Sequence, residues 1–478
     1  MKNKKILVIS LFASLSFSGY AQEADEIKTV NIAGIEQDVK ESAASISIIS
    51  GEDLTKRSAK NVTNSLYGYG LGLTTLQNSG HYATQEPTLY VRGMQTLSDN
   101  KGPLTLVDGI ERDIKLITPE EVESVQILKD AAAVALYGYK GANGVINIIT
   151  KRGKYNTREI KFSYDHVINW EARRPEFVDG YTYALAVNEA LANDGVRKPR
   201  YHELELDAFK SGNYPYFYPN VNWMDEVFKN TAATNLYNIS FRGGGAKFRY
   251  YALLNLTTDK GFIDNANMND GYSTQNKYSK ANLRTNLDID LTSTTKMTVN
   301  LLGTLAETSR PGDNADLWSM IYQLPPTAFP VRTENGLWGG SITWAGTLNP
   351  VAQSQATAYT KGHNRSLYAD MTLKQDLSSI LPGLGGSFKL AYDNYAAYVE
   401  NHSKTYRYGI DYVAWASGKP TAGTQNVFGT ESPMGTDSDM SEWKRNFNSA
   451  LGLDYQYASD KHAVYTQLTQ SPYRHVPV

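Results

Sequence analysis

From residue 155 onward, apolar and polar residues alternate in runs of about ten residues, the length that a tilted membrane strand requires. In the clearest run, residues 283–291, most odd positions are leucine or isoleucine and the even positions are arginine, asparagine or aspartate. Further runs lie at 160–170, 297–305, 367–373 and 447–457. A period of two sends successive side chains to opposite faces of a strand. The pattern therefore predicts strands with one apolar and one polar face.

The segments between these runs alternate in length. Nine strands are predicted, and the long connections between them are 171–233, 259–279, 309–364 and 401–442. The short connections are 243–246, 292–295, 378–386 and 458–460. A barrel in an outer membrane has tight periplasmic turns on one side and long outer loops on the other. The order favours an antiparallel transmembrane β-barrel over residues 155–478.

Residues 43–154 have a different pattern, with short β-rich runs between helix-start signals, which predicts a small α+β domain. Short strands are expected at 46–49, 89–93 and 104–109, and helices are expected to begin at Ser50, near Asn61 and at Thr118. Thr118 is followed by Pro119 and, three residues on, by Glu121, which is the pattern of a helix start. Asp108-Gly109 has the composition of a tight turn.

The stretch from Glu121 to Lys154 reads as strand, helix and strand. A β-branched run leads into an alanine-rich segment, and a second β-rich run follows from Val145. Asp130 precedes the alanines, where its carboxylate could accept the free amide protons of a first helical turn. Glycines at 138, 141 and 144 suit a sharp turn from helix to strand, and a structural role is favoured over ligand binding.

The N-terminus predicts export. Three lysines precede an apolar run from Ile6 to Phe17, and small residues suit cleavage after Ala21, so residues 1–21 are expected to be a signal peptide. Residues 22–42 are polar and are expected to be extended. They could be an untethered tail, or they could offer a strand to a partner's sheet edge.

Composition excludes several classes of function. The chain has no cysteine, and its formal net charge of −2 gives no basic footprint for nucleic acid. The seven histidines lack ligand spacing, so neither a metal nor a cofactor is expected, and acidic pairs fit helix capping better than general acid–base catalysis. The 33 tyrosines against 14 phenylalanines suit a membrane–water interface. A secreted, soluble, β-rich glycan-binding protein or hydrolase fits the composition equally well.

For some residues, both a functional and a purely structural role are possible. Arg92 and Asp108 could make charged contacts between the small domain and a barrel wall, or they could be ordinary turn and strand-end residues. Four tryptophans of the long loops could stack on sugar rings, although packing within a loop core is favoured: Trp318, Trp338, Trp344 and Trp415.

Several motifs resemble the SusC/RagA class of TonB-dependent outer-membrane transporters. In the plug domain of that class, 43–154 here, the matching residues are Arg92, Gly93, Asp108, Gly109, Lys129, Asp130, Tyr137, Gly138, Gly141 and Gly144. The place of the TonB box is taken by Ile27, Lys28, Thr29, Val30, Asn31, Ile32, Ala33 and Gly34.

The resemblance implies a function as well as a fold. It implies a plug inside an outer-membrane barrel, and TonB-dependent import of oligosaccharides or peptides together with a SusD-like surface lipoprotein. TonB, within the TonB–ExbB–ExbD complex, would pull on the box, and no chemistry would occur on this chain. The barrel of such transporters has about twenty-two strands, whereas about nine are predicted here. We therefore expect a C-terminally truncated chain.

Overall fold

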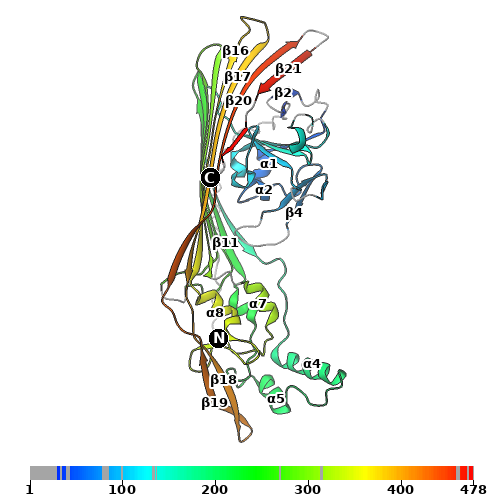
Figure 1. Ribbon diagram of the computed structural model, residues 1–478, viewed down its shortest axis with the longest axis vertical. Coiled ribbons are helices and arrows are strands. Elements are labelled where there is room, and N and C mark those ends of the chain that lie inside the picture. The colour runs from blue at the N-terminus through cyan, green and yellow to red at the C-terminus, as the bar shows by residue number, and fades with distance from the viewer. Residues whose placement is uncertain are drawn as a thin grey trace, which may run out of the picture.

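The computed structural model describes residues 29–32, 35–38, 44–77, 86–97, 101–131, 135, 137–267, 271–312, 316–458, 463–470 and 473–476. A small domain lies against the concave face of a tall curved sheet, and a second group of helices and strands lies at one end of that sheet (Figure 1). Near the N-terminus, β1 (Thr29–Ile32) and β2 (Ile35–Asp38) form an antiparallel hairpin.

The small domain is built on a five-stranded sheet in the order β3-β8-β9-β6-β7. Its strands are β3 (Ile46–Ser50), β6 (Leu104–Val107), β7 (Ile110–Glu111), β8 (Val122–Leu128) and β9 (Val145–Thr150), and β4 (Leu73–Leu76) pairs separately with β5 (Thr88–Val91). The helical turns are α1 (Gly51–Thr55), α2 (Val62–Ser65), η1 (Ile114–Leu116), η2 (Pro119–Glu121) and η3 (Gly138–Gly141). The structure thus contains the predicted α+β domain.

Local sequence signals account for most of these boundaries. The Ser50 hydroxyl accepts a hydrogen bond from the Asp53 amide at 3.0 Å, and the Asn61 side chain caps α2 in the same way. Asp108 and Gly109 have φ of 50° and 77°, which makes the tight hairpin between β6 and β7. Most of the predicted alanine-rich helix, at 132–134 and 136, lies outside the described residues. Asp130 itself accepts a hydrogen bond from the Ser45 amide at 2.5 Å, so its carboxylate ties β8 to the start of β3.

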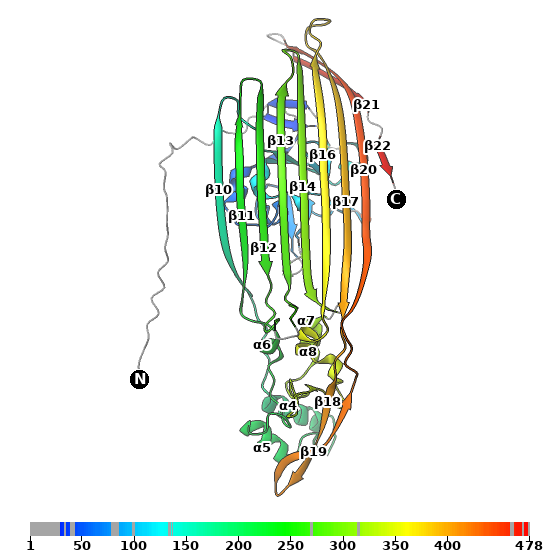
Figure 2. The ribbon, with the colours of Figure 1, turned by 90° about the vertical axis from the view of Figure 1, so that its left-hand side faces the viewer.

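The tall sheet, called the wall below, contains the nine predicted strands in sequence order, all antiparallel. They are β10 (Arg158–Trp170), β11 (Thr231–Gly244), β12 (Phe248–Lys260), β13 (Lys277–Asp290), β14 (Thr295–Pro311), β16 (Tyr359–Asp376), β17 (Leu384–Ser403), β20 (Gly435–Ala458) and β21 (Ala463–Gln470). A short β22 (Tyr473–Val476) also pairs with β20. In the described residues β10 and β21 end this path, so the sheet is open rather than closed into a barrel (Figure 2).

The alternation along the wall strands places apolar residues on the convex face. Leu283 is 50% exposed, whereas its neighbours Asn282 and Arg284 are 0% and 2% exposed. Phe162 of β10 and Leu305 of β14 are 67% and 59% exposed on the same convex face. In water, such a surface would cost about 25 cal/mol for each Å² of apolar area. The wall is therefore inverted relative to a soluble sheet, with polar residues buried against the small domain.

The long connections pack into a cap at the end of the sheet opposite the short turns (Figure 1). Its elements are α4 (Gly180–Asn193), α5 (Glu203–Ser211), α6 (Trp223–Val227), α7 (Leu317–Gln323), β15 (Trp338–Gly339), η5 (Gly346–Leu348), α8 (Pro350–Gln355), β18 (Tyr408–Ala416) and β19 (Lys419–Phe428). A core that includes Trp223, Phe329, Trp338 and Val351 holds the cap together. Within the described part of the chain, no helix is long and apolar enough to cross a membrane.

Candidate functional site

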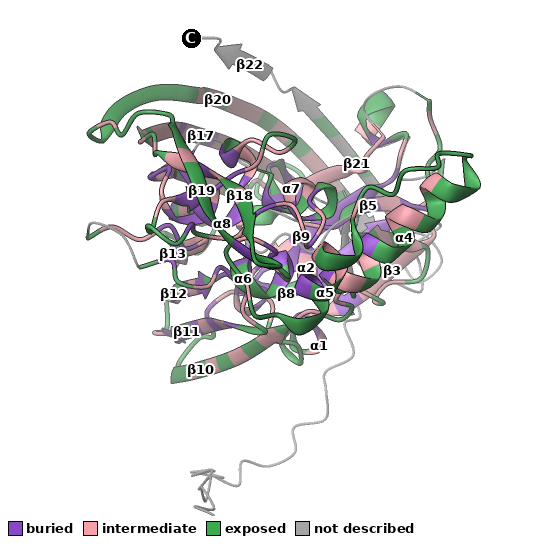
Figure 3. Ribbon diagram, turned by 90° about the horizontal axis from the view of Figure 1, so that it is seen from below, coloured by how far each residue is buried: buried purple, intermediate pink, exposed green. Residues whose placement is uncertain are grey.

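The face between the small domain and the wall carries most of the buried charge of the molecule. Viewed along the strands, the sheet curves around the small domain, and buried residues gather where the two meet (Figure 3). The apolar core of the small domain extends to Leu302 and Tyr368 of the wall. Around this shared core lies a ring of ion pairs and hydrogen bonds, described below as the plug–wall interface.

The deepest ion pair joins Glu121 of the small domain to Arg284 of β13. Their side chains are 0% and 2% exposed, and Arg284 Nε donates to Glu121 Oε2. Glu121 Oε1 also accepts hydrogen bonds from the Thr118 hydroxyl at 2.8 Å and from Asn282 Nδ2 at 3.2 Å. A buried pair of this kind is destabilising to break, because removal of one partner leaves the other charge buried and uncompensated.

A second charged contact is made by Arg112, just after β7. Its Nη1 donates to Asp370 of β16 at 2.7 Å, and its Nη2 and Nε donate to Asp393 of β17 at 2.7 and 3.0 Å. The guanidinium also lies over the Tyr368 ring, 5.1 Å from the centroid. Burial opposes the charge, but the two carboxylates outweigh it and raise the pKa of Arg112. Arg112 therefore remains a cation held between two strands of the wall.

Wall side chains also reach main-chain carbonyl groups of the small domain. Asn282 Nδ2 donates to the Leu116 carbonyl at 2.6 Å, and Asn286 Nδ2 donates to the Lys151 carbonyl at 2.8 Å. Tyr251, Lys280 and Lys389 similarly donate to the carbonyls of Glu120, Lys60 and Asp108 at 2.8, 2.8 and 3.1 Å. Each contact satisfies a polar group that would otherwise be buried without a partner.

The Asp108 carboxylate anchors the β6–β7 hairpin within the small domain. It accepts hydrogen bonds from the Thr150 amide at 3.0 Å and the Thr150 hydroxyl at 2.6 Å, and Arg152 Nη2 lies 3.6 Å away. Burial acts to raise the pKa of Asp108, but the nearby Arg152 and the Thr150 hydrogen bonds outweigh it and hold that pKa below its usual value. Arg152 in turn donates to Asn300 of β14 at 2.5 Å, which links the hairpin to the wall.

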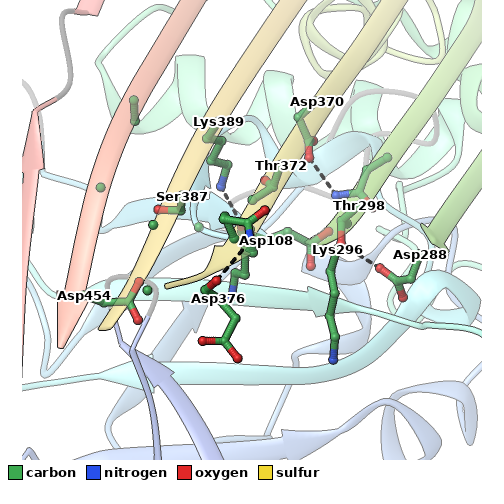
Figure 4. A pocket seen from close by; sticks show the side chains of 18 of the residues that line it. Asp108, Asp288, Lys296, Thr298, Asp370, Thr372, Asp376, Ser387, Lys389 and Asp454 are labelled. Atoms are coloured by element: carbon green, nitrogen blue, oxygen red, sulfur yellow. Dashed lines mark hydrogen bonds between the residues drawn. The ribbon is translucent and has the colours of Figure 1, made fainter. Parts of the chain in front are cut away.

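A polar cavity of about 1110 Å³ lies beside this hairpin, between it and strands β14, β16, β17 and β20 (Figure 4). Serine, threonine, glycine, lysine and aspartate dominate its lining, and it includes Thr294 and Gly383 from the short turns. Asp370, which binds Arg112, also lines it. The cavity therefore reaches from the short-turn end of the wall to the Arg112 contact.

The structure distributes the residues predicted from sequence over several roles. Asp108 contacts the wall through its carbonyl group, whereas Arg92 is exposed with a φ of 57°, and within the described residues no hydrogen bond or ion pair joins it to the wall. Lys129 Nζ donates to Ser47 Oγ at 2.8 Å inside the small domain, and Tyr137 and Gly109 line the cavity. Gly93, Gly138 and Gly144 have φ of 83°, 60° and 86°.

Gly144 shows most clearly why glycine is needed. A Cβ atom at this position would lie 2.6 Å from Cβ of Val91, so any larger residue would push β5 away from the domain. Gly141 is buried in the 3₁₀ turn before it. These observations support the structural role that the sequence favoured for the glycines.

Sequence reasoning missed the residues that carry the interface. Arg284 and Asn286 were recognised only as the polar face of a strand, Glu121 only as part of a helix start, and Arg112, Asp370 and Asp393 were not singled out. One signal could have found some of them: charged residues on the polar face of a strand whose other face is apolar indicate a buried polar contact on the inner side of the sheet. Of the loop tryptophans, Trp338 is buried at 8% exposure and Trp344 packs against the same core, while Trp318 and Trp415 are 39% and 38% exposed.

Comparisons with known proteins agree with this architecture. The family model "TonB-dependent Receptor Plug Domain" matches residues 38–145. The chain is 23% identical over 313 residues to TonB-dependent receptor P3 of Formosa agariphila, which covers 64% of this chain and 28% of that protein. It is 24% identical over 255 residues to TonB-dependent receptor SusC of Bacteroides thetaiotaomicron, covering 51% of this chain and 23% of SusC.

Among solved structures, the RagAB peptide importer in its closed-closed state has the same fold over 90% of this chain. The TM-score is 0.65, the sequence identity is 16%, and the match covers 47% of that importer chain. The present chain thus spans about half of the solved relative, and its sequence matches cover about a quarter of the two receptors above. The small domain is accordingly a plug, and the sheet is part of a barrel wall.

Proposed function

We propose that this chain, which is a SusC/RagA-type TonB-dependent receptor of the outer membrane, acts in the import of oligomeric nutrients across that membrane. The observation that carries the proposal is the plug–wall interface. A plug tied to a wall by buried ion pairs, beside a polar cavity at the short-turn end, has the architecture of a closed gate. The matched family model and the relatives are TonB-dependent receptors, so we propose transport and not catalysis.

Energy would enter through the N-terminal segment. Residues 27–34 are the candidate TonB box, and Thr29–Ile32 of it is the strand β1, paired with β2. An extended segment of this kind can exchange its hairpin partner for the sheet edge of another protein. Ile27, Lys28, Ala33 and Gly34 lie outside the described residues. We propose that TonB takes up this strand and pulls on the plug.

The partner and the substrate class are proposed by homology. We propose oligosaccharides or peptides as cargo and a SusD-like lipoprotein as partner, as the resemblance to the SusC/RagA class implies. A relative named SusC and a fold relative named a peptide importer support membership of that class. We propose an orientation in which the short turns face the periplasm and the cap of long connections faces the outside of the cell. The lipoprotein would then sit on the cap and deliver the oligomer to the plug.

Deletion of residues 27–34 tests the proposal in cells that take up the oligomer. Uptake should fall to background, while binding of the oligomer at the cell surface should remain. Because the chain lacks cysteine, Thr29→Cys also provides a unique site for cross-linking to a cysteine variant of TonB, with Ser417→Cys in the cap as the matched control. Uptake that survives the deletion, or equal cross-linking at both positions, would contradict the assignment.

A further inference from the structure

Toward the cap, the residues on the convex face of the wall change from apolar to basic and aromatic. On β16, Tyr368 and Asp370 contact the plug, so the odd-numbered residues of this regularly paired strand face away from it. Leu373, Met371 and Leu367 form the apolar part of that outward row. The next outward positions toward the cap are Arg365, His363, Lys361 and Tyr359. The apolar band therefore ends on β16 at Leu367, and a basic and aromatic row follows.

Tyrosines of the neighbouring strand support these basic residues. Arg365 Nη2 donates to the Tyr398 hydroxyl at 2.8 Å, and His363 stacks on the Tyr398 ring with 4.7 Å between centroids. Farther out, the Tyr359 ring lies tilted against His402, with 4.3 Å between centroids. Aromatic and basic residues together are typical of the level where a membrane meets water. This row therefore marks the outer-leaflet boundary in the proposed orientation.

A groove continues from the row into the cap. Tyr272 lies against Tyr359, with 5.7 Å between ring centroids, and borders two adjoining cavities of about 290 and 590 Å³. Both cavities share Tyr272, Lys404 and Glu431, so they form one groove. Its lining comes from the β12–β13, β14–β16 and β17–β20 connections of the cap.

Among the described residues that line this groove, Arg332, Lys404 and Arg407 are cations and Glu431 is a carboxylate. Arg332 lies flat on the Trp338 ring, 3.7 Å from its centroid, and Nη1 donates to the Gly336 carbonyl at 2.9 Å. Lys404 pairs with Glu431 at 3.7 Å. Within the described residues, no ion pair involves Arg332 or Arg407, although both line the groove. Two guanidinium groups are therefore available to an anion, beside the flat surfaces of Trp338 and Tyr272.

We propose that this groove binds an anionic sugar, phosphorylated or carboxylated, that belongs to a glycolipid of the outer leaflet. Guanidinium groups pair with phosphate and carboxylate through two parallel hydrogen bonds, and aromatic rings offer an apolar face to the C–H groups of a sugar. The glycolipid is favoured over a soluble sugar because Tyr272, which borders the groove, packs against Tyr359 at the end of the outward row of β16. A substrate between plug and wall lies on the opposite side of the sheet. The assignment rests on the orientation in the proposed function.

The chain purified in detergent tests the proposal by titration with a rough-type lipopolysaccharide that carries a phosphorylated core. Tryptophan fluorescence is the readout, since Trp338 lies directly under Arg332. The double variant Arg332→Gln/Arg407→Gln should weaken binding by about tenfold for each arginine removed. The matched control is Arg158→Gln/Lys247→Gln, which removes two exposed cations near the short turns and should leave the affinity unchanged.

Competition separates the possible sources of the anion. A neutral glycolipid with the same acyl chains should bind at least tenfold more weakly than the anionic one. Equal binding of the two, or an Arg332/Arg407 variant that binds like wild type, would overturn the proposal. Inorganic phosphate or a free core oligosaccharide that binds as tightly as the lipid would overturn the glycolipid assignment. None of these measurements requires TonB. The binding result can therefore be interpreted even if the import hypothesis fails.

Discussion

The two sides of the plug–wall interface differ in whether a cavity borders them. Against β13, Glu121 and Arg284 are buried to 0% and 2% exposure, and wall asparagines cover the neighbouring carbonyl groups. Against β16 and β17, the side chains of Arg112, Asp370 and Asp393 are 3%, 1% and 11% exposed, and Asp370 also lines a cavity of about 1110 Å³. Both sets of charges are buried; the first is called the dry side below, and the second, which borders the cavity, is called the wet side.

This difference indicates how a plug could move without leaving the wall. Charges separated in a dry interface lose their partner without gaining water, whereas charges beside a cavity can be hydrated as they part. The Arg112 side should therefore open first under a pull, with the Glu121–Arg284 side acting as the hinge. The variants below test this contrast, from the largest expected effect to the smallest.

The largest effect is expected for Arg284→Met, which leaves Glu121 buried without its cation. The attachment of the plug should weaken by about 3–5 kcal/mol. Hydrogen exchange of the β8 amides in detergent-solubilised protein measures this loss. Arg284→Met/Glu121→Gln should recover much of the protection, because no charge then remains unpaired.

The matched control for this variant is Glu123→Gln. Glu123 is 49% exposed and lies 3.5 Å from Arg242, so loss of this pair should change the free energy by less than about 1 kcal/mol. If Arg284→Met were no more damaging than Glu123→Gln, the dry side would not be the stronger attachment.

Arg112→Met should have an intermediate effect. It leaves Asp370 and Asp393 without a cation, but Asp370 lines the cavity and can be hydrated from it, so about 2–3 kcal/mol is expected. Exchange should rise in β6 and β7 while β8 stays protected. Lys140→Met is the control, because Lys140 binds Glu111 of the same hairpin at the surface, at 39% exposure. Simultaneous loss of protection in β6 and β8 would refute a separate wet side.

The sequence was sufficient for the architecture because its signals are local. Side-chain alternation places Leu283 and Arg284 on opposite faces, and the lengths of the connections give the strand order. The caps at Ser50 and Asn61 and the turn at Asp108-Gly109 are likewise encoded within a few residues. Each of these features depends on backbone geometry that neighbouring residues determine.

The interface could not be predicted in the same way because its partners are distant in sequence. Glu121 and Arg284 are 163 residues apart, and Arg112 and Asp393 are 281 apart. Nothing local distinguishes Arg112 from Arg92, since both are cations in a loop after a strand. Only the packing of the plug turns Arg112 toward the wall, while a positive φ of 57° leaves Arg92 at the surface.

A smaller effect is expected for Asn286→Ala on the dry side. Asn286 Nδ2 donates to the Thr150 hydroxyl and to the Lys151 carbonyl, both at 2.8 Å. The alanine variant leaves these acceptors with fewer donors and should cost about 1–2 kcal/mol. Urea unfolding in detergent measures it, with Asn213→Ala in an exposed loop of the cap as the control. Equal midpoints for the two variants would show that asparagine contacts do not strengthen the dry side.

The smallest effect concerns how the stability of the β6–β7 hairpin depends on pH. The pKa of Asp108 is lowered in the folded state, so its contribution to stability is fully present above the unfolded value of about 4 and is lost as pH falls through the lower folded pKa. Asp108→Asn removes the charge, and asparagine tolerates the φ of 50° at this position. The free energy of unfolding of the wild type should exceed that of the variant by about 1 kcal/mol or less between pH 8 and pH 5. This difference should shrink only below pH ~4. Exchange of the Thr150 amide, which donates to Asp108, reports the difference directly. A gap that closes between pH 7 and pH 5 would mean that Asp108 is not held as a carboxylate by Arg152 and Thr150, and that the wet side loosens in mild acid.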